Sequence, residues 1–272
     1  MLSHHTIVIR GAGDVATGVA ARLWRSGFCV IMTEISHPLT VRRTVSLSDA
    51  VYDGEALVED LTGRRVECRA QIRKAFQERV IPVTVDPEAA IVEEMAPYAV
   101  IDAVMAKKNT GARMDLAPLV VGLGPGFTAG RDVHAVVETK RGHTLGRVIW
   151  NGPAFPNTGI PGEIQGVGAK RVLRAPGPGM FKGICAIGTH VEKGATVAYA
   201  GDMPVIAPIS GMLRGLLHDG VWVETGLKSG DIDPRDIREN CWTISDKALA
   251  IGGGVLEAIL MALNRTHSHK SP

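Results

Sequence analysis

Residues Thr6–Glu34 read TIVIRGAGDVATGVAARLWRSGFCVIMTE, and this stretch decides the fold of the first part of the chain. An apolar, β-branched run opens it, which is typical of a strand buried on both faces. Gly11 and Gly13 follow at once, and residues 14–26 then carry small side chains at helical spacing. A second apolar run ends at Glu34. Strand, Gly-x-Gly turn, helix, strand and acid together predict a βαβ unit that can hold a dinucleotide.

Four residues of this unit are the first candidates for cofactor binding. Gly11 permits a tight turn, and Gly13 lets the backbone approach a pyrophosphate beside the helix N-terminus, where N–H groups are free. Glu34 stands where a ribose-binding acid is expected. Asp14 places a carboxylate near the expected phosphate position, so it repels a phosphate unless its side chain turns away to cap the helix. The alternative, a Rossmann-type unit that serves only as a scaffold, stays open.

The composition describes an ordinary globular protein. The chain has 272 residues, of which 45% are hydrophobic and 21% charged, and its net charge is +2. This charge is too small for a nucleic-acid or membrane-surface protein. The four cysteines show no CxxC spacing, which indicates free thiols in a reducing compartment and no zinc motif. With neither a signal peptide nor an apolar run of membrane-spanning length, we expect a cytoplasmic protein.

Residues 1–110 alternate strand and helix signals, which predicts a parallel sheet and an α/β domain of Rossmann type. The pair Arg42 and Arg43 lies in the polar segment after the βαβ unit. We interpret it as solvated surface, with contact to a phosphate as the alternative. The elements expected after it are a hairpin of residues 56–58 and 64–68, helices at 70–79 and 87–95, and strands at 81–85 and 98–105.

A glycine-rich loop, GLGPGFTAGRD at residues 122–132, is too rich in glycine and proline for a routine turn. Successive backbone N–H groups in such a loop can bind an anion, and a neighbouring arginine can assist. Gly124, Gly126 and Arg131 are therefore candidate cofactor-binding residues. We expect residues 111–170 to form a Gly-rich β segment that completes the site of the first domain.

A strand expected at residues 132–139, DVHAVVET, carries the candidate catalytic residues. Strand alternation places His134 and Glu138 on one face and an apolar set on the other. A histidine beside carboxylates can serve in acid–base chemistry or as a metal ligand. The same face also fits the polar side of an antiparallel strand with surface ion pairs. Both interpretations remain, and the sequence assigns no metal site.

From about residue 171 the pattern changes to short strands and turns, which predicts a β-rich domain at 171–244. A hairpin motif, VEKGATV, returns loosely as VWVETGLKSGD, with APISG between the two. This repeat resembles the barrel-sandwich hybrid of biotinyl and lipoyl carrier domains. The tip that carries a modified lysine in those domains reads AGDMP at 200–204, so the resemblance implies a structural or docking module. Residues 245–264 have helical spacing, and we expect this helix to pack back on the first domain.

Long motifs spread over almost the whole chain resemble the YqeB family. They are IVIRGAGDVATGVAARLWRSGF, MAKKNTG, VVGLGPGFTAGRDVHAVVETKRGHTLGRVIWNG and APISGMLRGLLHDG followed by GLKSGDIDPR. The resemblance implies an accessory component of a selenium-dependent molybdenum hydroxylase system. The Rossmann domain is also similar in kind to that of XdhC, a chaperone that handles molybdenum cofactor for xanthine dehydrogenase.

The sequence therefore predicts an α/β protein with an N-terminal Rossmann-like domain and a β-rich, barrel-sandwich-hybrid-like domain. Its expected function is maturation of a xanthine-dehydrogenase-like hydroxylase, with a nucleotide or molybdopterin-type cofactor as ligand. The expected partners are a hydroxylase subunit or other maturation factors. Two alternatives remain: an NAD(P)-dependent oxidoreductase and a non-catalytic interaction scaffold. Catalysis and homo-oligomer formation stay open.

Overall fold

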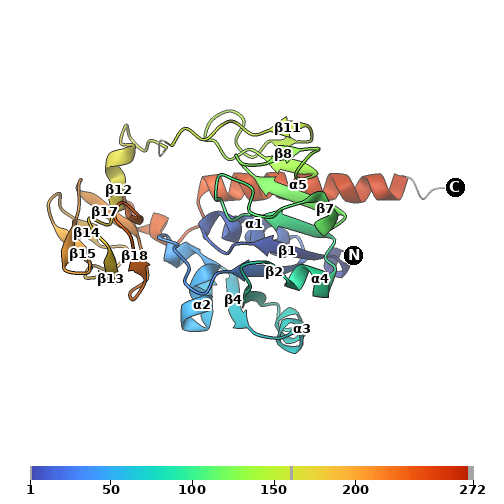
Figure 1. Cartoon of the computed structure of the whole chain (residues 1–272), viewed down its shortest axis with the longest axis horizontal. Coiled ribbons are helices and arrows are strands. Elements are labelled where there is room, and N and C mark those ends of the chain that lie inside the picture. Colours follow the sequence, from blue (N-terminus) through green and yellow to red (C-terminus); the bar gives the residue numbers. More distant parts are fainter. Residues whose placement is uncertain (1, 160–161, 269–272) are drawn as a thin grey trace.

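The computed structural model describes residues 2–159 and 162–268, which form two parts. The larger part is built on a nine-stranded sheet, and the smaller part, at the left of Figure 1, on two four-stranded sheets. The chain crosses from the larger to the smaller part and then returns with its last helix, which runs the length of the larger part (Figure 1).

The bounds of the regular elements, in chain order, are these. The helices are α1 Asp14–Arg25, α2 Ala50–Asp53, α3 Arg69–Gln77, α4 Ile91–Met95 and α5 Asp246–Ser268. The strands of the larger part are β1 Thr6–Arg10, β2 Cys29–Glu34, β3 Glu55–Val58, β4 Leu61–Val66, β5 Ile81–Val85, β6 Ala99–Asp102, β7 Leu119–Leu123, β8 Thr128–Ala129, β9 Ala135–Val137, β10 Val148–Ile149 and β11 Gly152–Pro153. Those of the smaller part are β12 Val172–Arg174, β13 Gly179–Gly183, β14 His190–Val191, β15 Thr196–Ala200, β16 Met203–Ile206, β17 Gly211–Leu216, β18 Trp222–Val223 and β19 Lys228–Asp233.

The strand order of the large sheet places a ligand-binding point at its centre. The order is β10-β9-β7-β6-β1-β2-β5-β4-β3, and every neighbouring pair from β9 to β4 is parallel. The edge strands β3 and β10 are antiparallel to their neighbours. Within it, β5-β2-β1-β6-β7-β9 reproduces the doubly wound order 3-2-1-4-5-6, which reverses between β1 and β6. The α/β prediction is confirmed, and such a reversal opens a crevice at the carboxyl ends of the strands.

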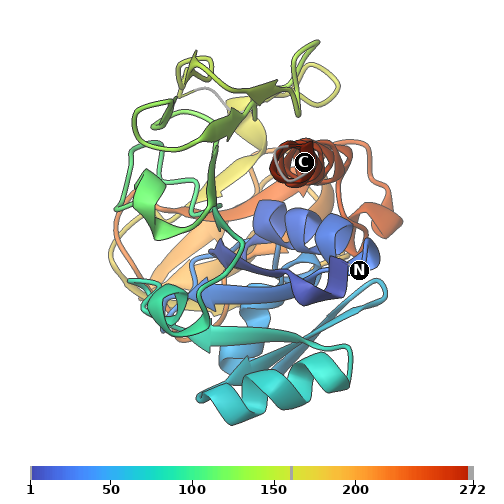
Figure 2. The same cartoon turned by 90° about the vertical axis from the view of Figure 1, so that its right-hand side faces the viewer.

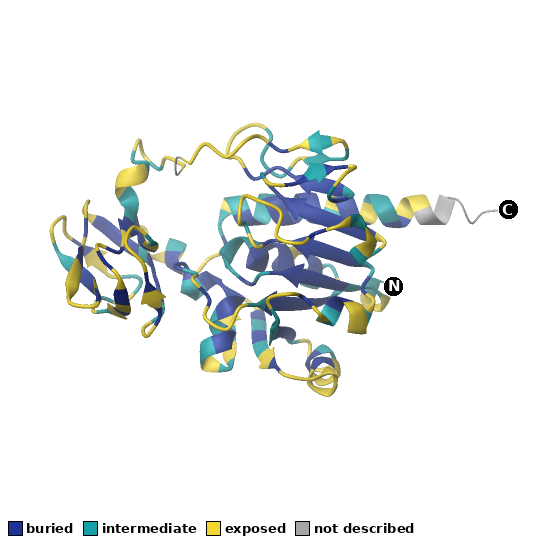
Figure 3. Cartoon of the chain, viewed as in Figure 1, coloured by how far each residue is buried: buried dark blue, intermediate teal, exposed yellow. Residues whose placement is uncertain are grey.

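Both faces of this sheet are covered, which explains the continuous apolar runs of its strands. Ile7 and Ile9 of β1 pack into the core that includes α1 and α5. Val8 points to the opposite face, into the core that includes residues of α3 and α4. Figure 2 shows α5 end-on beside α1 on one side of the sheet, and Figure 3 shows the buried strands between the layers.

Several predicted elements are shorter than expected, among them the strand predicted at 98–105, which is reduced to β6, Ala99–Asp102. The helix predicted at 87–95 begins only at Ile91, because the carboxylate of Asp86 accepts the amides of Ala90 (3.0 Å) and Ile91 (2.9 Å) and caps the turn before it. The strand predicted at 132–139 is reduced to β9, Ala135–Val137, and all three of its residues are buried. The alternative of an exposed polar face is therefore wrong, since β9 lies inside the covered sheet, parallel to β7 and antiparallel to β10.

The smaller part is β-rich, as predicted. Its sheets have the orders β12-β19-β17-β14 and β16-β15-β13-β18, with antiparallel pairs throughout. Apolar side chains of both sheets, among them Phe181, Leu213 and Ile232, form one core between them. Its identification with a barrel-sandwich hybrid stays a prediction.

A short segment of the larger part, residues 41–44, ties the two parts together; we name it the strap. Val41 packs into the core of the smaller part, and its carbonyl accepts the amide of Leu216 at 2.7 Å. The Arg43 guanidinium donates to the carbonyl of Leu216 at 2.9 Å. A Cβ at Gly215 would lie 2.9 Å from the Val41 carbonyl oxygen, so only glycine permits this approach.

The last helix packs closely on the first because both carry glycine where they meet. A Cβ at Gly18 of α1 would lie 2.5 Å from the Cβ of Ala248. A Cβ at Gly252 would lie 2.6 Å from the Gly18 carbonyl oxygen, and one at Gly254 would lie 2.1 Å from the Gly146 carbonyl oxygen. The contact between α1 and α5 therefore leaves no room for a methyl group at Gly18 or Gly252, and the backbone at Gly146 leaves none at Gly254.

Three consecutive glycines of α5 provide a matched test of this packing. Gly252→Ala and Gly254→Ala should each lower the free energy of unfolding by about 1–3 kcal/mol, because the new methyl group overlaps backbone atoms that cannot move easily. At the control position, Gly253, no atom lies within 4 Å of a Cβ. Gly253→Ala should therefore raise the stability by about 0.5–1 kcal/mol through helix propensity. Denaturant unfolding measures all three, and equal effects at the three positions would contradict the packing.

Candidate functional site

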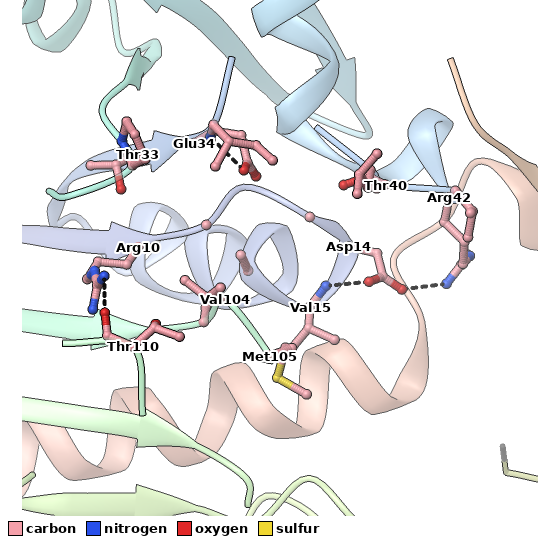
Figure 4. Close-up of a pocket in the computed structure, with 18 of the residues that line it drawn as sticks. Arg10, Asp14, Val15, Thr33, Glu34, Thr40, Arg42, Val104, Met105 and Thr110 are labelled. Carbon is pink, nitrogen blue, oxygen red and sulfur yellow. Dashed lines mark hydrogen bonds and ion pairs between the residues drawn. The ribbon is translucent and has the colours of Figure 1, made fainter. Parts of the chain in front are cut away.

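A cleft of about 720 Å³ opens at the carboxyl ends of β1, β2 and β6, where the strand order reverses. The Gly-x-Gly turn, Glu34 and the loop after β6 form its walls (Figure 4). Leu227 and Lys228 of the smaller part close one side. The sequence-predicted residues Gly11, Gly13, Asp14 and Glu34 all line this cleft, so the structure brings them together.

The turn after β1 requires glycine at its first position. Gly11 has φ +95°, a backbone conformation that residues other than glycine rarely adopt. Its amide donates to the Thr33 carbonyl at 2.8 Å, and a Cβ would lie 3.1 Å from the Ala103 carbonyl oxygen. The turn is thus held between the ends of β2 and β6, and its backbone faces the cleft.

Glu34 holds the turn rather than standing free at the end of β2. One carboxylate oxygen accepts the Ala12 amide at 2.9 Å, and the other accepts the Ile35 amide at 2.8 Å. Burial raises the pKa of this carboxyl, and the two amides act in the opposite direction. The carboxylate lies beside the glycine turn (Figure 4), where a ribose would be placed in a dinucleotide site.

The N-terminus of α1 is open to the cleft. Gly13 is its N-cap and provides no side-chain hydrogen bond. Asp14 turns back on its own helix: its Oδ1 accepts the Val15 amide at 2.9 Å, and its Oδ2 lies 3.6 Å from Arg42 (Figure 4). Within residues 2–159 and 162–268, no protein acceptor is assigned to the amides of Gly13, Asp14 and Ala16. These amides can therefore receive an anion.

A buried ion pair lies at the reversal point itself. Arg10 ends β1 and Asp102 ends β6, and their side chains meet at 2.7 Å with almost no exposure. Burial raises the pKa of Asp102, and the Arg10 charge opposes this shift. Arg10 also donates to the Thr110 carbonyl at 3.2 Å, so the pair anchors the loop that forms one wall of the cleft.

Arg42 corrects the expectation of a solvated surface. Its side chain is only 7% exposed, and it donates to the Asn240 carbonyl at 3.0 Å. Burial, and then the nearby Arg214, lower the pKa of this guanidinium. Arg42 lines the cleft beside Asp14. This position is compatible with the alternative prediction, in which the arginine contacts a phosphate.

A second cavity, of about 670 Å³, adjoins the cleft and extends between the two parts. The two share Asp14, Val15, Arg42, Met105 and Lys228. Its other walls come from the hairpin after β9, the start of α5 and the smaller part. The N-terminus of α1 therefore faces both spaces.

The two candidate catalytic residues do not share a cavity. Glu138 lines the second cavity and is buried, and its carboxylate accepts three amides, those of Thr139 (2.8 Å), Lys140 (2.7 Å) and Phe155 (2.8 Å). His134 lines neither space; its Nδ1 accepts the Val120 amide at 2.9 Å, and burial lowers its pKa. Both side chains hold backbone in place, and their catalytic role stays a prediction.

The glycine-rich loop lies beside the second cavity, with Pro125 on its wall. A Cβ at Gly124 would lie 2.2 Å from the Thr139 hydroxyl oxygen. A Cβ at Gly126 would lie 2.7 Å from the backbone nitrogen of Lys108. Close packing thus accounts for both glycines. Arg131 lines neither space, and its exposed side chain pairs with Asp132 at 3.1 Å.

Sequence reasoning missed Lys228 and Lys247, which both line the second cavity. Lys228 begins β19 in the smaller part, and Lys247 lies in the first turn of α5. They belong to different parts of the chain, so no local pattern could have paired them.

The described ranges, 2–159 and 162–268, contain neither a membrane-spanning helix nor a cluster of metal-ligating side chains. No helix there combines the length and apolar character needed to cross a bilayer. No cluster of three or more His, Cys, Asp or Glu side chains in those ranges is placed to hold a metal ion.

Comparison with solved structures gives only distant likenesses. TcdA (CsdL) overlaps 98% of this chain and 89% of its own with 11% identity and a TM-score of 0.37. An aspartoacylase family protein of Mesorhizobium loti overlaps 84% of each chain with 9% identity and a TM-score of 0.27. Overlaps this weak define neither a shared fold nor a shared activity.

Comparison with curated proteins gives a strong match. No family model matches the chain, but it is 49% identical over 262 residues to the uncharacterized protein YqeB of Escherichia coli (strain K12). The match covers 96% of this chain and 48% of YqeB, so the chain spans about half the length of that relative. This supports the resemblance that the motifs indicate: the chain is a homologue of YqeB along almost its whole length.

Proposed function

We propose that this protein binds a nucleotide-type ligand in the cleft, with a phosphate at the N-terminus of α1. One observation carries the proposal: the open amides after the Gly-x-Gly turn face a 720 Å³ cleft where the strand order reverses. Ligands of doubly wound sheets bind at this point.

Different groups of the cleft would bind the ribose and the phosphate of the ligand. Glu34 supplies a carboxylate beside the turn, suited to a ribose hydroxyl, while its two backbone hydrogen bonds fix its position. The amides of Gly13 and Ala16 receive the phosphate, assisted by the positive end of the helix dipole. Asp14 points back to the Val15 amide and toward Arg42, which moderates its repulsion of that phosphate.

We propose further that the protein is a cytoplasmic maturation factor for a selenium-dependent, xanthine-dehydrogenase-like molybdenum hydroxylase. The family motifs and the homology to YqeB support the family, and the role comes from the resemblance alone. A molybdopterin carries a phosphate and often a nucleotide half, so its chemistry suits this cleft. The proposed partners are a hydroxylase subunit or other maturation factors, as for XdhC.

An NAD(P)-dependent oxidoreductase is the second candidate, favoured by the position of Glu34 at the end of β2. Hydride transfer from NAD(P)H to an acceptor would select it. Absence of any nucleotide binding, together with a stable complex with a hydroxylase subunit, would instead select the interaction scaffold.

Gly13→Asp tests the ligand site without harming the fold. Gly13 has φ −66° and ψ −176°, and a Cβ there meets only the Thr40 hydroxyl, at 3.4 Å. Aspartate is a favourable N-cap, so the ligand-free variant should be at least as stable as the wild type. Its carboxylate occupies the phosphate position, and the thermal stabilisation by the ligand should disappear. A thermal-shift screen with NAD, NADP, FAD, ATP, CTP, GTP and a pterin measures this; a hundredfold excess over Kd stabilises by about 2.7 kcal/mol.

The matched control is Ala70→Asp, which adds a carboxylate to the first turn of α3, at an exposed position outside the cleft. It should keep the full ligand-induced shift. A normal shift in Gly13→Asp would rule out the phosphate at α1.

Asp14→Asn tests the electrostatics of the same site. Removing the carboxylate should tighten binding of a phosphorylated ligand about two- to fivefold, because a negative charge leaves the helix N-terminus. The affinity of the corresponding unphosphorylated nucleoside should not change. Titration calorimetry measures both, and weaker binding of the phosphorylated ligand would show that Asp14 itself recognises the ligand.

A further inference from the structure

The second cavity has a surplus of positive charge that the proposed phosphate at α1 does not use. Among the described residues, eight basic and four acidic side chains line it. The whole chain is almost neutral, with a net charge of +2. Cavity walls that concentrate one sign of charge attract ligands of the other sign.

Part of this surplus is neutralised within the protein. Asp231 pairs with Arg171 and, at 3.0 Å, with Arg214. Arg141 pairs with Asp246 at 2.6 Å. These guanidinium groups need no ligand to compensate them, so they belong to the framework of the cavity.

Lys228 and Lys247 are different. Within residues 2–159 and 162–268, neither has an ion-pair partner. Burial among protein atoms lowers the pKa of both ammonium groups, although the Lys228 side chain is exposed to solvent and that of Lys247 is half-buried. Asp14 acts on both charges from the N-terminus of α1. The two ammonium groups therefore face the same region from opposite parts of the molecule.

The start of α5 adds polar groups on the same wall. Ser245 lines the cavity, and its hydroxyl accepts the Ala248 amide at 3.2 Å as the cap of this helix. The positive end of the long helix α5 therefore adjoins Lys247.

We propose that the second cavity binds a second phosphoryl group of the ligand between Lys228 and Lys247, so that the ligand is a two-part compound joined through a pyrophosphate. This inference rests on the proposed function, because the first phosphate lies at α1. The nucleoside half then occupies the cleft, and the other half extends into the second cavity. The shared wall, Asp14 to Lys228, is where the pyrophosphate passes from one space to the other.

Positive charges that line one cavity repel each other, and an anion bound between them offsets that repulsion. Removing a lysine that stabilises the fold would instead lower the free energy of unfolding.

Inorganic pyrophosphate is the probe, titrated calorimetrically into the full chain and into Lys228→Met and Lys247→Met. Methionine keeps most of the stem and removes the charge. Each substitution should weaken pyrophosphate binding about tenfold, the effect of one charged hydrogen bond, and the wild-type affinity should fall with added salt. Lys182→Met, on an exposed lysine of β13 outside both spaces, is the control and should bind like the wild type.

A second readout separates binding from structural support. Both lysine variants should be at least as stable thermally as the wild type without ligand, because neither lysine has an ion-pair partner within the described residues. Lower stability, or unchanged pyrophosphate affinity in both variants, would overturn the inference. Nucleotide binding lost in Gly13→Asp but unaffected by either lysine variant would keep the proposed function and remove the second subsite. Pyrophosphate binding that depends on the lysines, without any nucleotide binding, would keep the second subsite and remove the proposed nucleotide site.

Discussion

The close contact between α1 and α5 is the constraint on which the rest of the structure depends. Gly18 and Gly252 let the two helices touch through backbone, so the end of the chain is fixed beside its beginning. The smaller part lies between these ends in sequence, and the strap fixes it on its other side. A space between the two parts therefore keeps a defined shape.

That geometry brings the N-termini of both helices to one region. Asp14 of α1 and Lys247 of α5 line the same cavity, and Lys228 reaches it from the smaller part. A Rossmann-type sheet alone would offer only the open amides of α1 and Glu34. The smaller part adds cations, so in the proposed site a phosphorylated ligand would contact both parts of the chain.

Local spacing was enough to predict that Gly11, Gly13, Asp14 and Glu34 lie close together, because a βαβ unit sets their relation within about thirty residues. It was not enough for Lys228 and Lys247, whose proximity depends on how the two parts are placed. The exposed-face interpretation of His134 and Glu138 failed for a different reason. Their alternation suggested an exposed polar face, but β9 is covered on both sides, and each side chain satisfies backbone amides instead.

Phosphate binding between the two parts can be tested directly by locating bound anions in a crystal of this protein. Tungstate, a heavy oxyanion that can stand in for phosphate, gives an anomalous signal that locates it without knowledge of the natural ligand. We expect the strongest peak in the space between the α1 N-terminus, Lys228 and Lys247. Peaks confined to surface arginines such as Arg131, with that space free of tungstate, would contradict it.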